Sequence, residues 1–326
     1  MLRLFRQKKT ETELEKIVTR LKENDPSLTT LNLNGSSIGV HGANAIAKAL
    51  EVNKVLATLN LRNNSIGIEG AKAIADALKV NKVLTALNLD VNIIGNEGAK
   101  TIAKALKVNE KLTKLDLDNN SIGVDGARAI AEAIKLNTVL TTLGLNHNSI
   151  GVEGAKTIAE ALKFNEKLTT LDLKDNSIGV DCAKAIANAL KVNKVLTTLD
   201  LGHNAIGFGG AKSIADALKV NTFLTKLHLN GNSIGDNLIN DIQKLVSNKR
   251  KTGTELENFV KHLNHASYLS TKVPSVYTPA HHQHAVQVEP KTATLIDSLI
   301  NAILSKMKRN NENADIQEEG LFQLAR

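Results

Sequence analysis

The sequence predicts an α/β solenoid in which short parallel strands alternate with helices along a chain of 326 residues. Three observations support this prediction. A strand pattern, LxxLxL, recurs at a constant spacing of 28 residues. Each copy is followed by an alanine-rich pattern typical of a helix. The chain also has no tryptophan, two tyrosines and six phenylalanines, although a large globular core normally uses aromatic side chains to fill its volume. Small aliphatic residues in a fixed period indicate thin layers that repeat. The eight copies of the pattern begin at Leu28, Leu56, Leu84, Leu112, Leu140, Leu168, Leu196 and Leu224.

The second copy, residues 56–83, shows how one unit is expected to fold. Leu59 and Leu61 point into the core with a period of two, so the residues between and beside them point to the other face of the sheet. Residues 71–81 (AKAIADALKVN) place apolar side chains at i, i+3, i+4 and i+7, which is typical of one face of a helix. Asn81 follows this helix, where the sequence predicts a left-handed cap.

Two positions of the unit hardly vary, and each has a physical reason. A buried asparagine amide must be hydrogen-bonded, so the recurrent asparagine after the strand is expected to form a ladder between neighbouring copies. Ser36 takes its place in the first copy. The glycine that follows Ile66 recurs in all eight copies and indicates a turn with positive φ. The asparagines are Asn64, Asn92, Asn120, Asn148, Asn176, Asn204 and Asn232.

A solenoid exposes an apolar section at each end and therefore needs caps. Residues 11–23 are expected to form an N-terminal capping helix, and residues 237–247 and 255–265 to form closing helices. The predicted divisions are an N-terminal cap at 1–27, eight repeats at 28–251, a C-terminal capping helix at 252–265, a linker at 266–290, and an amphipathic helix with a flexible tail at 291–326.

The pattern LTTLDLxxNSIGxxGAKAIAxAL resembles the ribonuclease-inhibitor subclass of leucine-rich repeats, and the resemblance covers about two thirds of the chain. This subclass includes the repeat regions of NOD-like receptors and of Ran GTPase-activating proteins. The resemblance implies a right-handed horseshoe with a parallel sheet on the concave side and helices on the convex side. It is specific for the fold and says little about function.

Composition and charge bear on the classes of partner. The formal charge is +8, but the excess is spread along the chain and forms no stretch typical of specific nucleic-acid binding. The single cysteine, Cys182, fits a reducing compartment. The N-terminus lacks the apolar stretch of a Sec signal peptide, and no run is long enough for a membrane span. These features predict a cytoplasmic protein.

Some residue types that form catalytic, metal or nucleotide sites in other proteins have structural explanations in this sequence. Cys182 occupies a slot held by glycine in most other copies, so it is expected to be a small buried residue. The HHQH segment, His281 to His284, lacks the further ligands of a metal site. The recurrent IGxxG pairs are turn motifs, and no Walker-type loop is present. We therefore predict no catalytic residues, no cofactor, no metal and no enzymatic activity.

The outward residues of the predicted concave sheet are the default binding surface of such a fold. They vary from copy to copy and are polar, with Arg62 as the one residue of the types that dominate binding hot spots. This predicts a polar, salt-sensitive contact with a protein partner, while a merely solvated sheet face stays an alternative. The candidate residues are Thr58, Asn60, Arg62, Asn88, Asp90, Lys114, Asp116, Asp118, Asn146, His147, Asp172, Lys174, His203 and His228.

A second candidate contact lies in the tail. Residues 292–309 are expected to form a helix with one apolar stripe, which needs a partner. Three alternatives are packing on the same chain, association with another helix, and contact with a membrane surface. The stripe that would make a helix-mediated contact includes Leu295, Ile296, Leu299, Ile300 and Ile303.

The leading functional prediction is an interaction scaffold that binds a macromolecule through its concave face. The alternative, based on resemblance, is a GTPase-activating or other enzyme-regulating protein similar to Ran GTPase-activating proteins, although the acidic C-terminal region of that family is missing here. A stand-alone repeat array also resembles secreted bacterial effectors that reach a host cytosol by a non-Sec route. Glu312, Glu318 and Glu319 resemble a type IV translocation signal.

Overall fold

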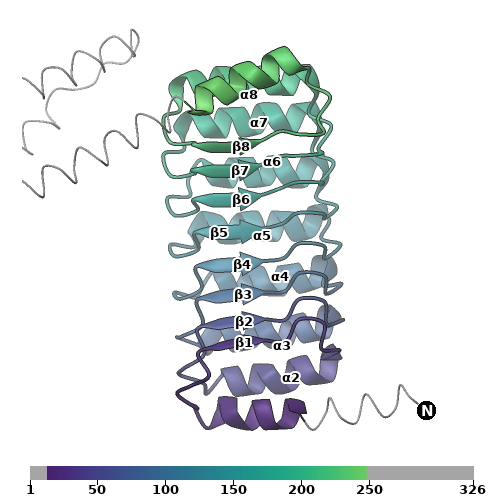
Figure 1. Cartoon of the computed structure of the whole chain (residues 1–326), viewed down its shortest axis with the longest axis vertical. Coiled ribbons are helices and arrows are strands. Elements are labelled where there is room, and N and C mark those ends of the chain that lie inside the picture. The colour runs from purple at the N-terminus through teal and green to yellow at the C-terminus, as the bar shows by residue number, and fades with distance from the viewer. Residues whose placement is uncertain (1–12, 248–326) are drawn as a thin grey trace, which may run out of the picture. The chain divides into compact units, whose positions relative to one another are not determined.

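The computed structural model describes residues 13–247, in which strand–helix units stack one on another (Figure 1). A helix over residues 13–22 precedes the first strand, and a helix over residues 236–247 follows the last one. The strands are β1 (Thr30–Asn32), β2 (Thr58–Asn60), β3 (Ala86–Asn88), β4 (Lys114–Asp116), β5 (Thr142–Gly144), β6 (Thr170–Asp172), β7 (Thr198–Asp200) and β8 (Lys226–His228). The helices between them are α2 (Gly39–Leu50), α3 (Gly67–Val80), α4 (Gly95–Leu106), α5 (Val124–Leu136), α6 (Gly151–Leu162), α7 (Gly179–Val192) and α8 (Gly207–Val220).

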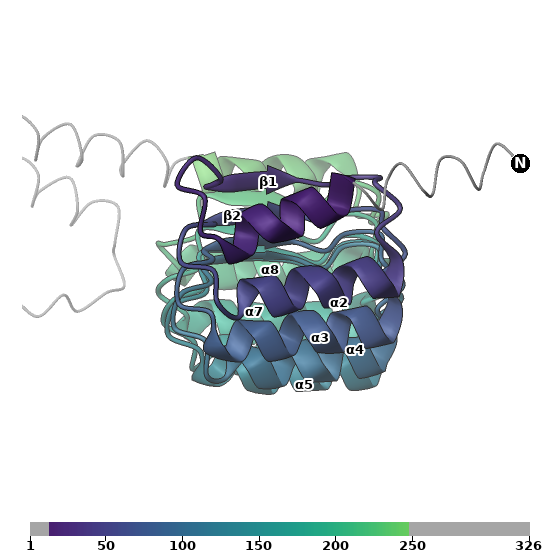
Figure 2. The ribbon, with the colours of Figure 1, turned by 90° about the horizontal axis from the view of Figure 1, so that it is seen from below.

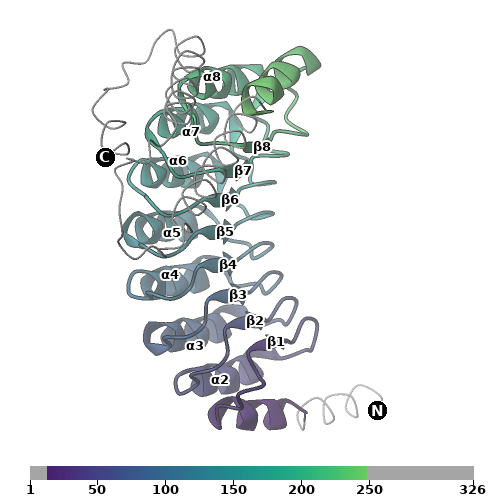
Figure 3. The ribbon, with the colours of Figure 1, turned by 60° about the vertical axis from the view of Figure 1, so that its left-hand side comes forward.

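The strands form one parallel sheet in chain order, β1 to β8. Each strand residue lies opposite the residue 28 positions later, as Leu59 does opposite Leu87. The helices form a second layer on one face of this sheet (Figure 2). Within the described repeats, the strands line the inner side of the curve and the helices its outer side (Figure 3). The predicted α/β solenoid with a parallel concave sheet is confirmed.

The core lies between the two layers and is aliphatic. In the second copy Leu59, Leu61, Ile74 and Leu78 are all fully buried. The remaining inward positions of each helix are largely alanine, which lets the helix approach the strands closely. Burial of these side chains is the main favourable contribution to folding.

Helices cover the first and last strands of the described stack, over residues 13–22 and 236–247. Leu21 is fully buried at the first end, and Ile242 and Val246 are buried at the last. The predicted capping helix at 255–265, linker at 266–290 and amphipathic helix at 292–309 lie outside the described residues. So do the histidines of the HHQH segment.

The predicted asparagine ladder is confirmed, and Asn92 shows its geometry. The Nδ2 group donates to the carbonyl oxygen of Leu61, 2.8 Å away in the preceding copy, and to that of Leu89, 2.9 Å away in its own copy. Its Oδ1 atom accepts the backbone N–H groups of Asn64 (3.0 Å) and Ile66 (3.3 Å). One buried side chain thus satisfies backbone groups of two consecutive turns.

The predicted left-handed cap at Asn81 is wrong. Asn81 has φ −67° and ψ 128°, which is extended backbone. Its side chain instead forms a second ladder, because Nδ2 donates to the carbonyl oxygen of Leu50 (2.7 Å) and Oδ1 accepts the N–H of Leu84 (2.8 Å). The same position holds a buried asparagine in all seven helix-to-strand turns: Asn53, Asn81, Asn109, Asn137, Asn165, Asn193 and Asn221.

The recurrent glycine adopts positive φ in seven of its eight copies, as Gly67 does with φ 63°. Gly123 is the exception, with φ −98°. There the Oδ1 atom of Asn96 accepts the N–H of Gly123 at 2.8 Å and that of Gly126 at 2.9 Å. The side chain of Asn96 therefore holds this helix start in a different conformation.

Cys182 is fully buried, as predicted. Burial raises the pKa of its thiol to about 12, so almost no thiolate forms near neutral pH. We expect a water-soluble disulfide reagent to label native Cys182 about a hundredfold more slowly than the urea-unfolded chain. Timed labelling followed by intact mass measurement tests this. Equal rates for the native and unfolded chains would show that the thiol is accessible in the fold.

Candidate binding surface on the concave sheet

The outward side chains of the concave sheet form two parallel rows. The strand row is the outward position at the end of each strand: Asn32, Asn60, Asn88, Asp116, Gly144, Asp172, Asp200 and His228. The second row lies two residues further along each copy: Asn34, Arg62, Asp90, Asp118, Asn146, Lys174, Gly202 and Asn230. Because the strands are in register, neighbours in the strand row are directly opposed, as Asp116 and Gly144 are.

Much of the strand row has a structural role. The Oδ1 atom of Asn88 accepts the N–H of Asp90, two residues later, at 2.9 Å. This local bond holds the chain as it leaves the strand. The same bond, at 2.8 to 3.1 Å, is made by Asn32, Asn60, Asp116, Asp172 and Asp200. The hydrogen bond within the turn is therefore sufficient to account for a polar residue in this row, without a ligand.

Gly144 interrupts the row and changes its surroundings. It has no side chain to accept the N–H of Asn146, and the Oδ1 atom of Asp118 accepts that N–H instead, at 2.7 Å. A Cβ atom at Gly144 would lie 2.8 Å from Oδ1 of Asp118 and 3.0 Å from Oδ1 of Asp116. Both carboxylates thus lean over Gly144. The Oδ1 atom of Asn146, beside them, is buried and has no hydrogen-bond partner among the described residues.

Three half-buried side chains, Asp116, Asp118 and Asp172, are here called the central carboxylates. None of them forms an ion pair within residues 13–247. Burial, followed by the nearby charge of Asp116, raises the pKa of Asp118 to about 7. The pKa of Asp116 and that of Asp172 are also raised, mainly by burial. Negative charge at this place is costly because it is partly removed from water and has like charges around it.

Asp90, predicted as an outward binding residue, is fully buried. Its carboxylate forms an ion pair with Arg62 and accepts a hydrogen bond from Nδ2 of Asn119 at 3.1 Å. The prediction for Asp90 is therefore corrected: the side chain joins neighbouring copies and presents no free surface. Arg62 stays half-exposed above it.

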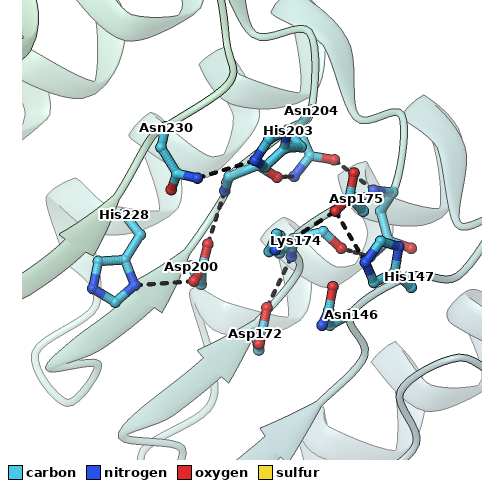
Figure 4. A network of polar contacts seen from close by, with 12 residues as sticks. Asn146, His147, Asp172, Lys174, Asp175, Asp200, His203, Asn204, His228 and Asn230 are labelled. Carbon is cyan, nitrogen blue, oxygen red and sulfur yellow. Dashed lines mark hydrogen bonds and ion pairs between the residues drawn. The ribbon is translucent and has the colours of Figure 1, made fainter.

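Towards the C-terminal copies, histidines and carboxylates form a polar network (Figure 4). Nε2 of His147 lies 3.2 Å from Oδ2 of Asp175, and Nδ1 of His228 lies 2.9 Å from Oδ2 of Asp200. His203 contacts Nδ2 of Asn230 at 3.1 Å. Nζ of Lys174 is 3.9 Å from Asp175. Carboxylates outside the centre of the surface thus have nearby basic partners.

Apart from buried Asp90, the predicted residues lie on one surface but have different roles. Thr58 and Asn60 lie on β2, and exposed Lys114 lies on β4. Asn88 donates from Nδ2 to Oδ2 of Asp116 at 3.1 Å. Gly144 and Asp200 were not among the predicted site residues. Asp200 was detectable, since it lies 28 residues after Asp172 in the same row.

Within residues 13–247, no group of three or more His, Cys, Asp or Glu side chains is arranged to hold a metal ion. In the same part of the chain, no helix has the length and apolar character needed to cross a membrane.

Comparisons with known proteins agree with the repeat architecture. The TMOD/LMOD leucine-rich domain model matches residues 10–149, and the Leucine Rich repeat model matches residues 164–187, 192–215 and 220–237. No curated protein matches the chain.

Three solved structures are similar to the chain at low identity. Leiomodin-1 actin-binding site 2 is 19% identical, covering 76% of this chain and 95% of that one, with a TM-score of 0.35. The tropomodulin C-terminal domain of Caenorhabditis elegans is 11% identical, covering 76% and 98%, with a TM-score of 0.34. The leucine-rich repeat-containing protein LegL7 of Legionella pneumophila is 18% identical, covering 67% and 82%, with a TM-score of 0.42.

The assignment of a family follows from the matched models and from the stacked units. Both models describe leucine-rich repeats, and together they span most of residues 10–237. Eight in-register strands alternate with helices at the spacing that the sequence repeats. The finer resemblance to the ribonuclease-inhibitor subclass and to NOD-like receptors stays a prediction. The chain is a leucine-rich-repeat protein.

Proposed function

We propose that this protein binds a partner protein through its concave face, and that the central carboxylates receive a basic segment of that partner. The observation that carries the proposal is the absence of an ion pair at Asp116, Asp118 and Asp172 within residues 13–247. Other acidic residues of the same surface have such partners, as Asp90 has Arg62 and Asp175 has Lys174.

The geometry favours a lysine or arginine side chain as the group that binds here. Asp116 and Asp118 are held over Gly144 by bonds to backbone N–H groups, so little side-chain freedom is lost when a cation arrives. A guanidinium or ammonium group would supply the missing positive charge and donate to the remaining carboxylate oxygens. Since the surface offers no aromatic anchor, the contact depends on charge and should weaken as salt concentration rises.

A binding measurement tests the proposal. We expect the full chain to bind a fluorescein-labelled oligo-lysine peptide, and the triple variant Asp116→Asn, Asp118→Asn, Asp172→Asn to bind it about tenfold more weakly, because three carboxylates lose their charge. Fluorescence anisotropy at low and physiological salt gives both affinities.

The control removes the same charge from the opposite face. Glu69→Gln, Glu97→Gln and Glu153→Gln neutralise three exposed carboxylates on α3, α4 and α6. If binding depends only on net charge, both triple variants will lose affinity equally, and the concave site will have to be abandoned. The same pair of variants can be compared in pull-downs of candidate partners.

The remaining functional predictions concern the location of the protein in the cell and whether it has enzymatic or regulatory activity. A non-enzymatic role, a cytoplasmic location, and delivery as a secreted bacterial effector stay predictions from the sequence. So does the alternative of an enzyme regulator that resembles Ran GTPase-activating proteins.

A further inference from the structure

A row of exposed apolar side chains runs along one edge of the stack, where each helix turns into the next strand. All seven turns place an apolar residue at the same position, immediately before the buried ladder asparagine. These side chains are 52 to 63% exposed, although aliphatic and aromatic groups of this size normally lie inside. The row, here called the apolar rim, consists of Val52, Val80, Val108, Leu136, Phe164, Val192 and Val220.

The same turns are strongly basic. Taken from the residue before each rim position to the third residue after it, the seven turns contain eleven lysines and three glutamates. Their net charge equals the +8 of the whole chain. An excess of positive charge therefore lies at this edge, close to the apolar rim, although Lys79, Lys163 and Lys219 form ion pairs with carboxylates one helical turn earlier. The lysines are Lys54, Lys79, Lys82, Lys107, Lys111, Lys135, Lys163, Lys167, Lys191, Lys194 and Lys219.

The turns hold the rim in a fixed arrangement. The asparagine that follows each rim residue is buried and bonded to the preceding copy, as Asn165 is through Nδ2 to the carbonyl oxygen of Ile134 at 2.5 Å. Lysines lie close to the apolar groups: Nζ of Lys135 is 4.7 Å from the centroid of the Phe164 ring. Because the turns occupy equivalent places in successive copies, a flat surface can touch several of them at once.

We propose that the rim is a docking surface for an anionic lipid membrane. Apolar side chains flanked by lysines suit the interface of such a membrane, where the apolar groups enter among the acyl chains and the ammonium groups reach the phosphates. Nucleic acid fits less well, since the rim has no arginine and its regular element is an aliphatic side chain. Membrane contact at this edge leaves the central carboxylates of the concave face free for a protein partner.

A single tryptophan can report on this contact, because the chain has none of its own. Phe164→Trp places it on the rim. Phe208→Trp is a matched control: both phenylalanines are 60% exposed, but Phe208 is the second residue of α8, at the opposite end of the helices. With vesicles of phosphatidylcholine and phosphatidylserine, we expect a blue shift of emission and quenching by brominated lipid for the Phe164→Trp chain, and neither for the Phe208→Trp chain.

Charge reversal distinguishes membrane binding at the apolar rim from general electrostatic attraction between the protein and an anionic vesicle. In the Phe164→Trp chain, changing Lys79, Lys82, Lys191 and Lys194 to glutamate should abolish the shift. The same change at Lys72, Lys100, Lys156 and Lys184, each the sixth residue of its helix and so away from the rim, should retain most of it.

Three outcomes would overturn the proposal. The first is no shift at residue 164 with anionic vesicles, and the second is an equal shift at residues 164 and 208. The third is rim-dependent binding of soluble poly-glutamate without any vesicle binding, which would assign the rim to an acidic polypeptide.

Discussion

Replacing Asn92 by alanine is expected to lower the free energy of unfolding by about 3–5 kcal/mol. Asn92 is fully buried and bonds to backbone groups of two successive copies. Without the amide, the N–H groups of Asn64 and Ile66 lose an acceptor, and water cannot replace it in the core. In a solenoid each copy is stabilised by its neighbours, so the damage weakens the interface between copies.

Urea unfolding followed by circular dichroism measures the loss, and hydrogen exchange shows where it lies. Exchange should accelerate most in the second to fourth copies. Asn188→Ala is the control, because Asn188 is exposed on α7 and, within residues 13–247, its side chain bonds with Lys191 alone. A midpoint for Asn92→Ala equal to that of Asn188→Ala would mean that the asparagine ladder contributes little to stability.

The frame of this protein could be predicted because every copy repeats the same physical requirements. Leu59 and Leu61 alternate with polar residues, and the helix pattern of residues 71–81 has one apolar face, so strand and helix follow from period alone. Because the eight copies have the same length and the same order of strand and helix, the strands of successive copies are expected to pair in parallel. The recurrent Asn64 position indicated the ladder because a buried amide needs partners.

Where prediction failed, the role of a residue depended on neighbouring copies. Asn81 resembles a helix cap within its own copy, but its amide reaches Leu50 in the preceding one. Asp90 follows its strand at an outward position, yet Arg62 and Asn119 from adjacent copies cover it. A rule applied along one copy cannot detect contacts between residues about 28 positions apart.

The exposure of the apolar rim could not be predicted from the sequence for a different reason. Its residues recur in seven of the eight copies, as Val80 and Val108 do, and so the signal was present in the sequence. Their exposure was not evident, because an apolar residue at the end of a helical pattern is readily assigned to the core. The structure shows that the neighbouring asparagine is buried and the valine is not.

The position of the Asp118 carboxylate depends on Gly144, although the two residues belong to different copies of the repeat. Its missing side chain leaves the N–H of Asn146 to Asp118, which is thereby drawn beside Asp116 and partly buried. The spacing of 28 residues predicts that Gly144 lies between Asp116 and Asp172 in the sheet. The position of the Asp118 carboxylate, however, is evident only from the packed structure.

This arrangement predicts an unusual dependence of stability on pH. The pKa of Asp118 is raised from 3.8 to about 7 in the folded chain. The folded state therefore binds a proton that the unfolded state releases between these values, and the stability present below pH 3.8 is lost as pH rises through about 7. Asp118→Asn should leave stability near pH 4 unchanged and raise it at about pH 8 by about 1–2 kcal/mol, a value reduced to allow for solvent screening. Urea midpoints at the two pH values measure the effect.

A second variant tests the cause assigned to the shift. Gly144→Asn restores the residue type that accepts the local N–H elsewhere in the strand row, so Asp118 is no longer needed at Asn146. Its carboxylate should move into water, and the pH dependence between 4 and 7 should shrink. If the dependence persists undiminished in Gly144→Asn, another acidic group must be its source.

The same pair of measurements bears on function. A residue retained only for stability should not destabilise the free protein when it is charged, whereas a binding residue can, because a partner's cation removes the repulsion on contact. Asp118→Asn is therefore expected to stabilise the free chain at about pH 8 and, at the same pH, to weaken its binding of the oligo-lysine peptide. A variant that is more stable and binds equally well would separate the strained carboxylate from partner recognition and leave Asp116 and Asp172 as the groups to examine.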